Sequence, residues 1–282
     1  MYEEIIYEVT DPVATITLNR PEKLNALTNR TLAELHHAVA DAESREDVVG
    51  IVITGAGRGF CAGLDMATLQ AISQDGDSAT MNDDSGSDLS AARAGDAELR
   101  KEFGPGPFTY LLAVPKPVIA AVNGACAGLG FSLAIFSDMR FASEKAVFTT
   151  VFAHRGLVAE HGNSWMLPRL IGPGRALDVL WSGRKFDGEE ALHLGIANRV
   201  TSPDSLVEEA SEYIRNLAAT CSPTSIMHMK QQVYRQLNQP LGEAMQQTNR
   251  LQDESSKWPD FKEGVASFME RRPPKFGRIT SG

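Results

Sequence analysis

The chain has 282 residues, with 36 acidic against 27 basic side chains and a formal net charge of −9 at pH 7. This length allows one large domain, or one domain with a helical appendage. The negative balance argues against nucleic acid and anionic lipid as partners, because the sequence shows no phosphate-neutralising surface. The negative net charge is still compatible with a local basic site for a phosphorylated cofactor.

The cysteines point to a reducing compartment. Cys61, Cys126 and Cys221 are odd in number and widely spaced, so they predict neither a disulfide framework nor a CxxC metal site. No H-E-x-x-H motif or Cys/His cluster occurs, and we expect no metal. The N-terminus lacks the basic and apolar regions of an export signal, so we expect a cytoplasmic protein.

The first half of the chain predicts strands, glycine turns and helices in alternation. Tyr2–Val9 and Val13–Leu18 predict a hairpin, and Thr28 is the expected N-cap of a helix. Val48–Thr54 predicts a buried strand, followed by a glycine-rich loop at Gly55–Gly63 and a helix start at Leu64.

The segment Ser73–Asp96 differs in composition from its surroundings. It is rich in Asp, Ser and Gly and poor in large apolar residues, so it cannot form a packed core alone. We expect a flexible acidic insertion, either on the surface or as a lid over a substrate tail. A helical pattern returns over Ala97–Val114.

Val118–Phe136 carries no charge and approaches the length of a membrane span. Asn123 and several glycines interrupt it, so we interpret it as a buried strand, a turn and a buried helix at Phe131–Phe136. Two short strands follow, and from His161 onward the pattern is largely helical. The sequence predicts an α/β core over residues 1–200 and a helical C-terminal segment over residues 201–282.

Two segments share the form of a buried strand, a glycine turn and a helix start. They are Ile51–Asp65 and Ala120–Ser132. The first N–H groups of a helix lack intrahelical partners and carry partial positive charge, so two facing turns can aim two donors at one oxygen. Neither turn has the GxGxxG spacing of a dinucleotide site, and no Gly-Lys-Ser/Thr of a P-loop follows.

The chain resembles the crotonase superfamily, the enoyl-CoA hydratase/isomerase family, from the first hairpin to about Gly277. The matching motifs are Asn19-Arg20-Pro21-Glu22-Lys23-Leu24-Asn25-Ala26-Leu27, Gly59-Phe60-Cys61-Ala62-Gly63-Leu64-Asp65, Ala121-Val122-Asn123-Gly124, and Phe261-Lys262-Glu263-Gly264 with Phe268. Together they are specific for the family but not for the reaction. The resemblance implies a crotonase-like ββα spiral, an acyl-CoA thioester substrate, no cofactor beyond the CoA of the substrate, and a homotrimer or hexamer.

The resemblance also implies roles for residues of this chain. The N–H groups of Leu64 and Leu129 would form an oxyanion hole for the thioester carbonyl. Further positions are implied to contact the CoA ester: Lys23, Ala26, Leu27, Ala62, Gly63, Asp65, Met66, Gly128, Phe268 and Arg271. Asp65 also suits a helix start, where a carboxylate complements the dipole. Phe268 and Arg271 would reach CoA from a neighbouring subunit, unless Phe268 serves ordinary helix packing.

The acid/base positions depart from the family pattern. Ser132 and Phe152 stand where hydratases of the family carry two glutamates, and neither can transfer a proton usefully at neutral pH. Glu160 falls where some enoyl-CoA isomerases carry their catalytic carboxylate. An apolar pocket would raise its pKa toward neutrality. The alternative is a loop carboxylate that caps the helix starting near Asn163, and His161 and His154 are candidates to support the carboxylate.

These residues favour Δ3-Δ2-enoyl-CoA isomerisation with Glu160 as the acid/base. A 2-enoyl-CoA hydratase that uses Glu160 alone is the first alternative, and thioesterase, decarboxylase or dehalogenase chemistry would use the same oxyanion hole. An acyl-CoA-binding protein without turnover is the alternative outside enzymes. The net charge and the lack of a basic helix argue against RNA binding.

Overall fold

The computed structural model describes residues 2–75 and 93–279, and the chain begins with the predicted hairpin. Strands β1 (Ile5–Thr10) and β2 (Val13–Leu18) pair antiparallel. Helix α1 (Asn29–Ser44) follows, and the side chain of Thr28 accepts the N–H of Thr31 at 3.0 Å. The predicted N-cap is therefore confirmed.

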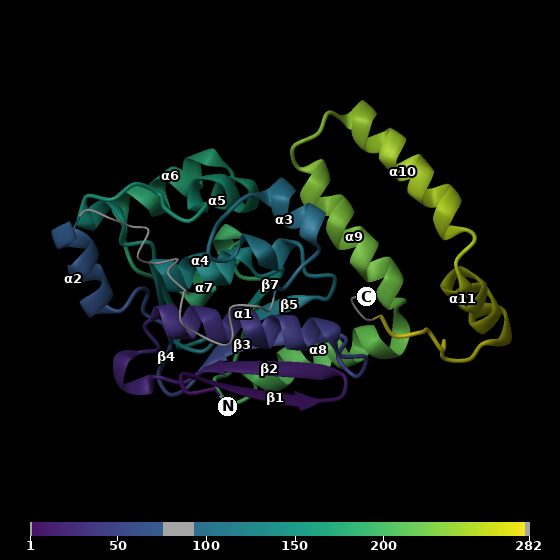
Figure 1. The fold of residues 1–282 in the computed structure, drawn as a ribbon, viewed down its shortest axis with the longest axis horizontal. Coiled ribbons are helices and arrows are strands. Elements are labelled where there is room, and N and C mark those ends of the chain that lie inside the picture. Colours follow the sequence, from purple (N-terminus) through teal and green to yellow (C-terminus); the bar gives the residue numbers. More distant parts are fainter. Residues whose placement is uncertain (1, 76–92, 280–282) are drawn as a thin grey trace.

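Two sheets form the core, and successive segments alternate between them. The remaining strands are β3 (Gly50–Gly55), β4 (Gly59–Cys61), β5 (Val118–Val122), β6 (Ala125–Ala127), β7 (Met139–Ser143), β8 (Val147–Thr149), β9 (Phe186–Asp187) and β10 (Arg199–Thr201). The larger sheet has the order β1-β2-β3-β5-β7-β10, and the smaller has the order β4-β6-β8-β9. Each pair β3–β4, β5–β6 and β7–β8 places one strand in each sheet, so the chain forms the predicted spiral of ββα units (Figure 1).

Alternate residues of the central strands pack on opposite faces of the larger sheet. In β3, Ile51 and Ile53 join the cluster that contains side chains of α1 and of α4 (Leu129–Phe136). Val52, between them, packs with side chains of α8 (Leu206–Thr220). This two-residue period is what a strand covered on both faces requires.

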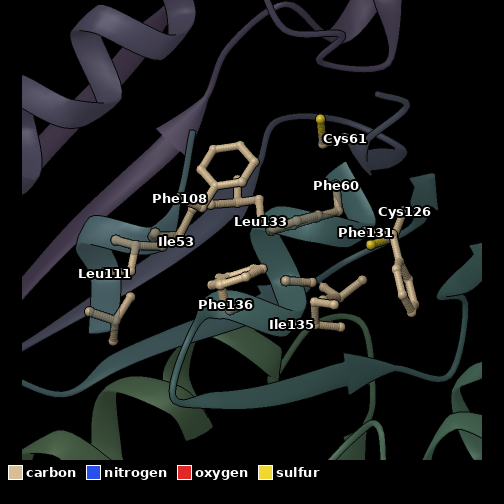
Figure 2. Close-up of a cluster of buried hydrophobic side chains, with 14 of the residues drawn as sticks. Ile53, Phe60, Cys61, Phe108, Leu111, Cys126, Phe131, Leu133, Ile135 and Phe136 are labelled. Atoms are coloured by element: carbon tan, nitrogen blue, oxygen red, sulfur yellow. The ribbon is translucent and has the colours of Figure 1, made fainter. Parts of the chain in front are cut away.

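Helix α4 lies in the centre of the protein, where all its residues are buried. Figure 2 shows Phe131, Leu133 and Phe136 of this helix in the cluster that also holds Phe60. The uncharged run Val118–Phe136 is thus a core strand and a core helix, as predicted, but the predicted turn contains the short strand β6 and the helix begins at Leu129. Among the described residues, no helix is both long and apolar enough to cross a membrane.

The other helices cover the edges of the spiral and form the C-terminal segment. They are η1 (Pro21–Lys23), α2 (Met66–Asp75), α3 (Ala97–Phe103), η3 (Thr109–Leu112), η4 (Ala153–Arg155), α5 (Asn163–Ile171), α6 (Pro173–Ser182), α7 (Gly188–Leu194), α9 (Pro223–Gln236), α10 (Leu241–Ser255) and α11 (Pro259–Glu270). The sequence predicted a largely helical chain after His161 and did not predict the strands β9 and β10. They are short and pair with β8 and β7, so no hydrophobic period marks them.

Two expectations between residues 73 and 114 need correction. Ser73 is an exposed residue of α2, and Ala94 is fully buried, so one end of the expected insertion 73–96 is helical and the other is part of the core. Residues 76–92, its central part, lie outside the described residues. The helical pattern 97–114 divides into α3 and η3, because Gly104-Pro105-Gly106-Pro107 cannot continue a helix.

The helical C-terminal segment begins within the core and then leaves it. β10 completes the larger sheet and α8 covers it, so residues 199–220 belong to the core rather than to an appendage. The side chain of Asp138 anchors α9, since its oxygens lie 2.7 Å from Lys230 Nζ and 2.9 Å from the Tyr234 hydroxyl. Helices α10 and α11 then extend away from the spiral (Figure 1).

Candidate active site

The smaller sheet brings the two glycine turns together. β4 and β6 pair in parallel, with Cys61 opposite Cys126, and each strand leads directly into its turn. The sequence placed β4 inside a loop, because three residues are too few to show a period. The sequence pattern did not show whether the two glycine turns meet, and the pairing of β4 with β6 places them side by side.

The backbones of the turns then touch at Gly63. A Cβ built on Gly63 would lie 3.0 Å from the Ala127 carbonyl oxygen and 3.5 Å from the Leu129 nitrogen. Gly63 also has a φ of +103°, which side chains rarely allow. Glycine at this position therefore allows both the backbone conformation and the close approach.

Two backbone N–H groups at this contact have no acceptor in the described part of the chain. Among the described residues, neither the N–H of Leu64 nor the N–H of Leu129 donates a hydrogen bond. Leu129 is the first residue of α4, so its N–H has no intrahelical partner and lies at the positive end of the helix. The geometry provides unpaired donors from two turns in contact, which is the arrangement that an oxyanion requires.

The loop before α1 pairs with the first glycine turn. Leu27 donates its N–H to the Gly63 carbonyl at 2.7 Å and accepts the N–H of Asp65 at 2.9 Å. Ala62 donates to the Leu24 carbonyl at 2.9 Å. The segments 23–27 and 62–66, both implied to contact CoA, thus lie next to each other. Lys23 is exposed in η1, and Met66 is 67% exposed at the start of α2.

Asp65 makes contacts typical of a helix start. Its Oδ1 accepts the N–H of Ala67 at 3.0 Å, and its Oδ2 lies 3.1 Å from Arg20. The bond from Ala67 and the charge of Arg20 lower the pKa of this carboxyl group. Arg20 also donates to the Ala26 carbonyl at 2.6 Å. The sequence motif contained Arg20 without indicating this role, because its partner is distant along the chain.

Within one chain, the C-terminal residues implied to contact CoA are not brought to the two turns. Phe268 lies on α11 and is 82% exposed, and Arg271 is the C-cap residue of that helix. Helix α11 lies at the far end of the molecule from β4 (Figure 1).

Glu160 lies on the turn that precedes α5. Its side chain is 34% exposed, and its Oε2 lies 3.6 Å from His161 Nε2. Its carboxylate makes no hydrogen bond with the helix, whose N-cap is Gly162 and has no side-chain cap. The capping interpretation of Glu160 is therefore wrong for this chain, since the turn closes through the Glu160 backbone carbonyl instead.

Burial acts on both titratable groups of this turn. It raises the pKa of the Glu160 carboxyl group and lowers the pKa of the His161 imidazole. Both shifts favour the neutral form of each group. His161 and Gly162 also line a cavity of about 490 Å³ together with apolar residues that include Phe103, Phe136 and Trp165.

A chain of hydrogen bonds joins the Glu160 turn to the start of α4. Asn163 Nδ2 donates to the Glu160 carbonyl and to Ser132 Oγ, each at 2.6 Å. Ser132 Oγ donates in turn to the Gly128 carbonyl at 3.2 Å. Asn163 is fully buried, and its Oδ1 has no partner among the described residues. Asn163 was missed by the sequence analysis, because no local pattern marks a contact between residues 132 and 163.

The remaining acid/base candidates are placed less favourably. Ser132 and Phe152 are buried, and Ser132 is already engaged by Gly128 and Asn163. His154 is exposed, and its ring lies against Gly183, where a Cβ would come within 3.1 Å of it. His154 makes no hydrogen bond or ion pair with Glu160 within residues 2–75 and 93–279, whereas His161 is its neighbour.

The fold and the facing turns define a class of α/β spiral proteins, and comparison with known proteins narrows it. The model of the enoyl-CoA hydratase/isomerase family matches residues 8–91 and 84–278. A probable enoyl-CoA hydratase of Rhodobacter capsulatus is 34% identical over 275 residues, covering 98% of each chain. The 1,2-epoxyphenylacetyl-CoA isomerase of Escherichia coli is 32% identical over 278 residues, covering 98% of this chain and 99% of that one.

Solved structures agree with these relatives. The crystal structure of an enoyl-CoA hydratase subunit I from Geobacillus kaustophilus superposes with a TM-score of 0.82 at 35% identity, covering 98% of both chains. The chain belongs to the enoyl-CoA hydratase/isomerase family, the crotonase superfamily.

Proposed function

We propose that the protein isomerises 3-enoyl-CoA to 2-enoyl-CoA, with Glu160 as the acid/base and the N–H groups of Leu64 and Leu129 as the oxyanion hole. The observation that carries the proposal is the environment of the Glu160 carboxyl group. Burial raises the pKa of this carboxyl group, and it is neither capping a helix nor paired with Lys or Arg in the described part of the chain. A carboxylate of raised pKa that no Lys or Arg neutralises suits proton transfer near neutral pH.

Each residue has a defined task in the proposed reaction. The ionised Glu160 removes a proton from C2, and the electron pair of that C–H bond moves onto the thioester oxygen as a dienolate forms. The two backbone N–H groups stabilise this oxyanion. Glu160 then returns the proton to C4, the double bond becomes conjugated with the thioester, and the enzyme is regenerated. The reaction needs no resident cofactor, because CoA enters as part of the substrate.

The test compares wild type with Glu160→Gln on a 3-enoyl-CoA, following the conjugated thioester absorbance that isomerisation creates. General acid/base groups contribute about 100- to 10,000-fold, and we expect a loss of kcat in that range. The matched control is Glu144→Gln, an exposed carboxylate on the turn after β7. A folded Glu160→Gln protein that isomerises at the wild-type rate rules out the proposal.

Hydration of 2-enoyl-CoA with Glu160 as sole acid/base is the second candidate. The names of several relatives favour it, including a short-chain-enoyl-CoA hydratase of Clostridium acetobutylicum at 30% identity. Ser132 and Phe152 argue against the two-glutamate form of that reaction. Loss of conjugated absorbance on adding 2-enoyl-CoA would identify a hydratase, while its appearance from 3-enoyl-CoA identifies the isomerase.

We propose a homotrimer or hexamer as the active assembly. Helix α11 exposes Phe268 and Met269 at 82% and 74%, and α10 exposes Leu241 at 77%. Large apolar side chains exposed on these two helices favour burial in an interface. A second copy of the chain is the proposed partner, which would place Phe268 and Arg271 against the CoA of its neighbour. Light scattering of wild type and Phe268→Glu tests this, with dissociation expected for the variant.

A further inference from the structure

A cavity beside α1 has basic walls, although the chain is acidic. It has a volume of about 610 Å³, within the usual range for small-molecule sites, and lies between α1 and the segment 93–110. Arg93, Arg100 and Lys101 line it, and none of its described lining residues is Asp or Glu. With 36 acidic and 27 basic residues in the chain, this concentration of positive charge indicates an anionic occupant.

Arg100 is a cation of this wall whose side chain makes no hydrogen bond to the described residues. Its side chain is half-buried, and its Nε is buried with no hydrogen-bond partner. Within residues 2–75 and 93–279, its terminal nitrogens also donate no hydrogen bond, and they stay accessible where the side chain lines the cavity. Lys101, in contrast, is paired with Glu98 at 2.7 Å on the surface.

Glu43 does not complete the pairing of Arg100. Its carboxylate accepts the N–H of Gly95, and burial raises the pKa of its carboxyl group. Tyr110 adds a second donor to the same wall, since its hydroxyl is buried without a partner among the described residues. Unpaired donors in a cavity wall cost stability unless a ligand accepts from them.

The cavity shares elements with the candidate active site. Its lining includes Asn29, two residues after Leu27, whose backbone bonds to Gly63 and Asp65 on either side of Leu64. Residues 105–107 and 109 line both this cavity and the smaller cavity that His161 lines. The start of α1 and the segment 105–109 therefore connect the basic cavity to both halves of the candidate site.

We propose that this cavity binds the far end of an acyl group that carries a terminal carboxylate, so that the enzyme selects ω-carboxyacyl-CoA thioesters. The inference rests on the proposed acyl-CoA function and adds the substrate class. Leu32, Ala33 and Ala97 supply apolar walls for the methylene chain. The guanidinium of Arg100 matches a carboxylate in geometry and charge.

The experiment measures binding by calorimetry for matched pairs of saturated thioesters, such as octanoyl-CoA and octanedioyl-CoA, over a series of chain lengths. Wild type should bind the carboxylated member about 10-fold more tightly at the optimal length, as one charge-assisted hydrogen bond allows. Arg100→Gln should abolish this ratio, and Tyr110→Phe should reduce it less. Arg235→Gln, which removes an exposed pair with Glu102, is the matched control and should keep the ratio.

Equal binding of both members of every pair by wild type overturns the proposal. Free CoA is measured in parallel, and an equal loss of its binding in Arg100→Gln assigns Arg100 to the CoA phosphates and also overturns it. If Arg100→Gln does not fold, two other measurements test the proposal. Tyr110→Phe should lower the preference for the carboxylated thioester, and added salt should lower that preference in wild type.

Saturated thioesters are not turned over, so the outcome is separable from the proposed reaction. A wild-type preference for the carboxylated member without isomerisation of any 3-enoyl-CoA would reject the reaction and support the binding site. Isomerisation without that preference would support the reaction and reject the carboxylate-binding site.

Discussion

The two halves of the candidate site are built in different ways. The oxyanion side consists of backbone N–H groups, and it is held by the parallel pairing of β4 with β6 and by the contact at Gly63. The acid/base side is a partly exposed side chain on a turn, held to α4 through Asn163 and Ser132. Backbone geometry changes only if the fold changes, whereas Glu160 can be replaced alone. This difference suits a family in which one fold supports several reactions.

Among the changes to residues that hold the site in place, Gly63→Ala should produce the largest effect, because it disturbs the backbone half. The variant places a Cβ 3.0 Å from the Ala127 carbonyl oxygen at a φ of +103°. The Leu64 N–H must then turn away, and we expect kcat/KM to fall about 100- to 1,000-fold, as when one oxyanion donor is lost. Steady-state kinetics on a 3-enoyl-CoA measures it.

The control for this variant is Gly172→Ala. Gly172 has a φ of +78°, and nothing lies within 4 Å of a Cβ built there, so backbone strain is imposed without a clash. It should lower the melting temperature while kcat/KM stays near the wild-type value. A folded Gly63→Ala protein of full activity would contradict the role given to this turn.

Asn163→Ala should have an intermediate effect, because it releases the acid/base half from α4. The Glu160 carbonyl loses a donor at 2.6 Å, and Ser132 loses its link to the turn. A displacement of about 1 Å can cost about 100-fold, and we expect up to that loss, in kcat more than in KM. The acid limb of the pH–rate profile should also move, which a general loss of stability would not cause.

Ser132→Ala separates the two bonds of Asn163. It removes one acceptor and keeps the bond to the Glu160 carbonyl, so its effect on kcat should be smaller than that of Asn163→Ala. Equal losses in the two variants would show that the link to α4, rather than the support of Glu160, controls the rate.

The smallest expected effect is the change in the free energy of unfolding that Glu160→Gln causes, which should depend on pH. Burial raises the folded pKa of Glu160, so the stability that this group contributes is full at low pH and is lost as pH rises through that pKa. Glu160→Gln should therefore be slightly more stable than wild type above the raised pKa, and the difference should shrink toward acid pH. The partial exposure of the side chain keeps it small.

Urea unfolding of both proteins at several pH values measures this difference. In wild type, the acid limb of kcat/KM should lie above the ordinary glutamate pKa of about 4.3. An acid limb at the ordinary value would remove the physical basis for Glu160 as the base.

The sequence by itself determined the α/β core, the hairpin, both glycine turns and the departure at Ser132 and Phe152, while the spiral was implied by the resemblance to the crotonase superfamily. These depend on local chemistry: a period of two in buried strands, glycine where φ is positive, and side chains that can or cannot carry a proton. It failed at β4, β6, β9 and β10, which are too short to show a period and exist only through pairing with neighbours.

Only the tertiary structure decided how these parts meet. The contact of Gly63 with the start of α4, the link from Asn163 to Ser132, and the cavity lined by Arg100 all join residues distant in sequence. The structure also ruled out that Glu160 caps α5, because this depended on where its carboxylate lies. The reason is physical: burial and hydrogen-bond geometry belong to neighbours in space, and a single sequence records only neighbours along the chain.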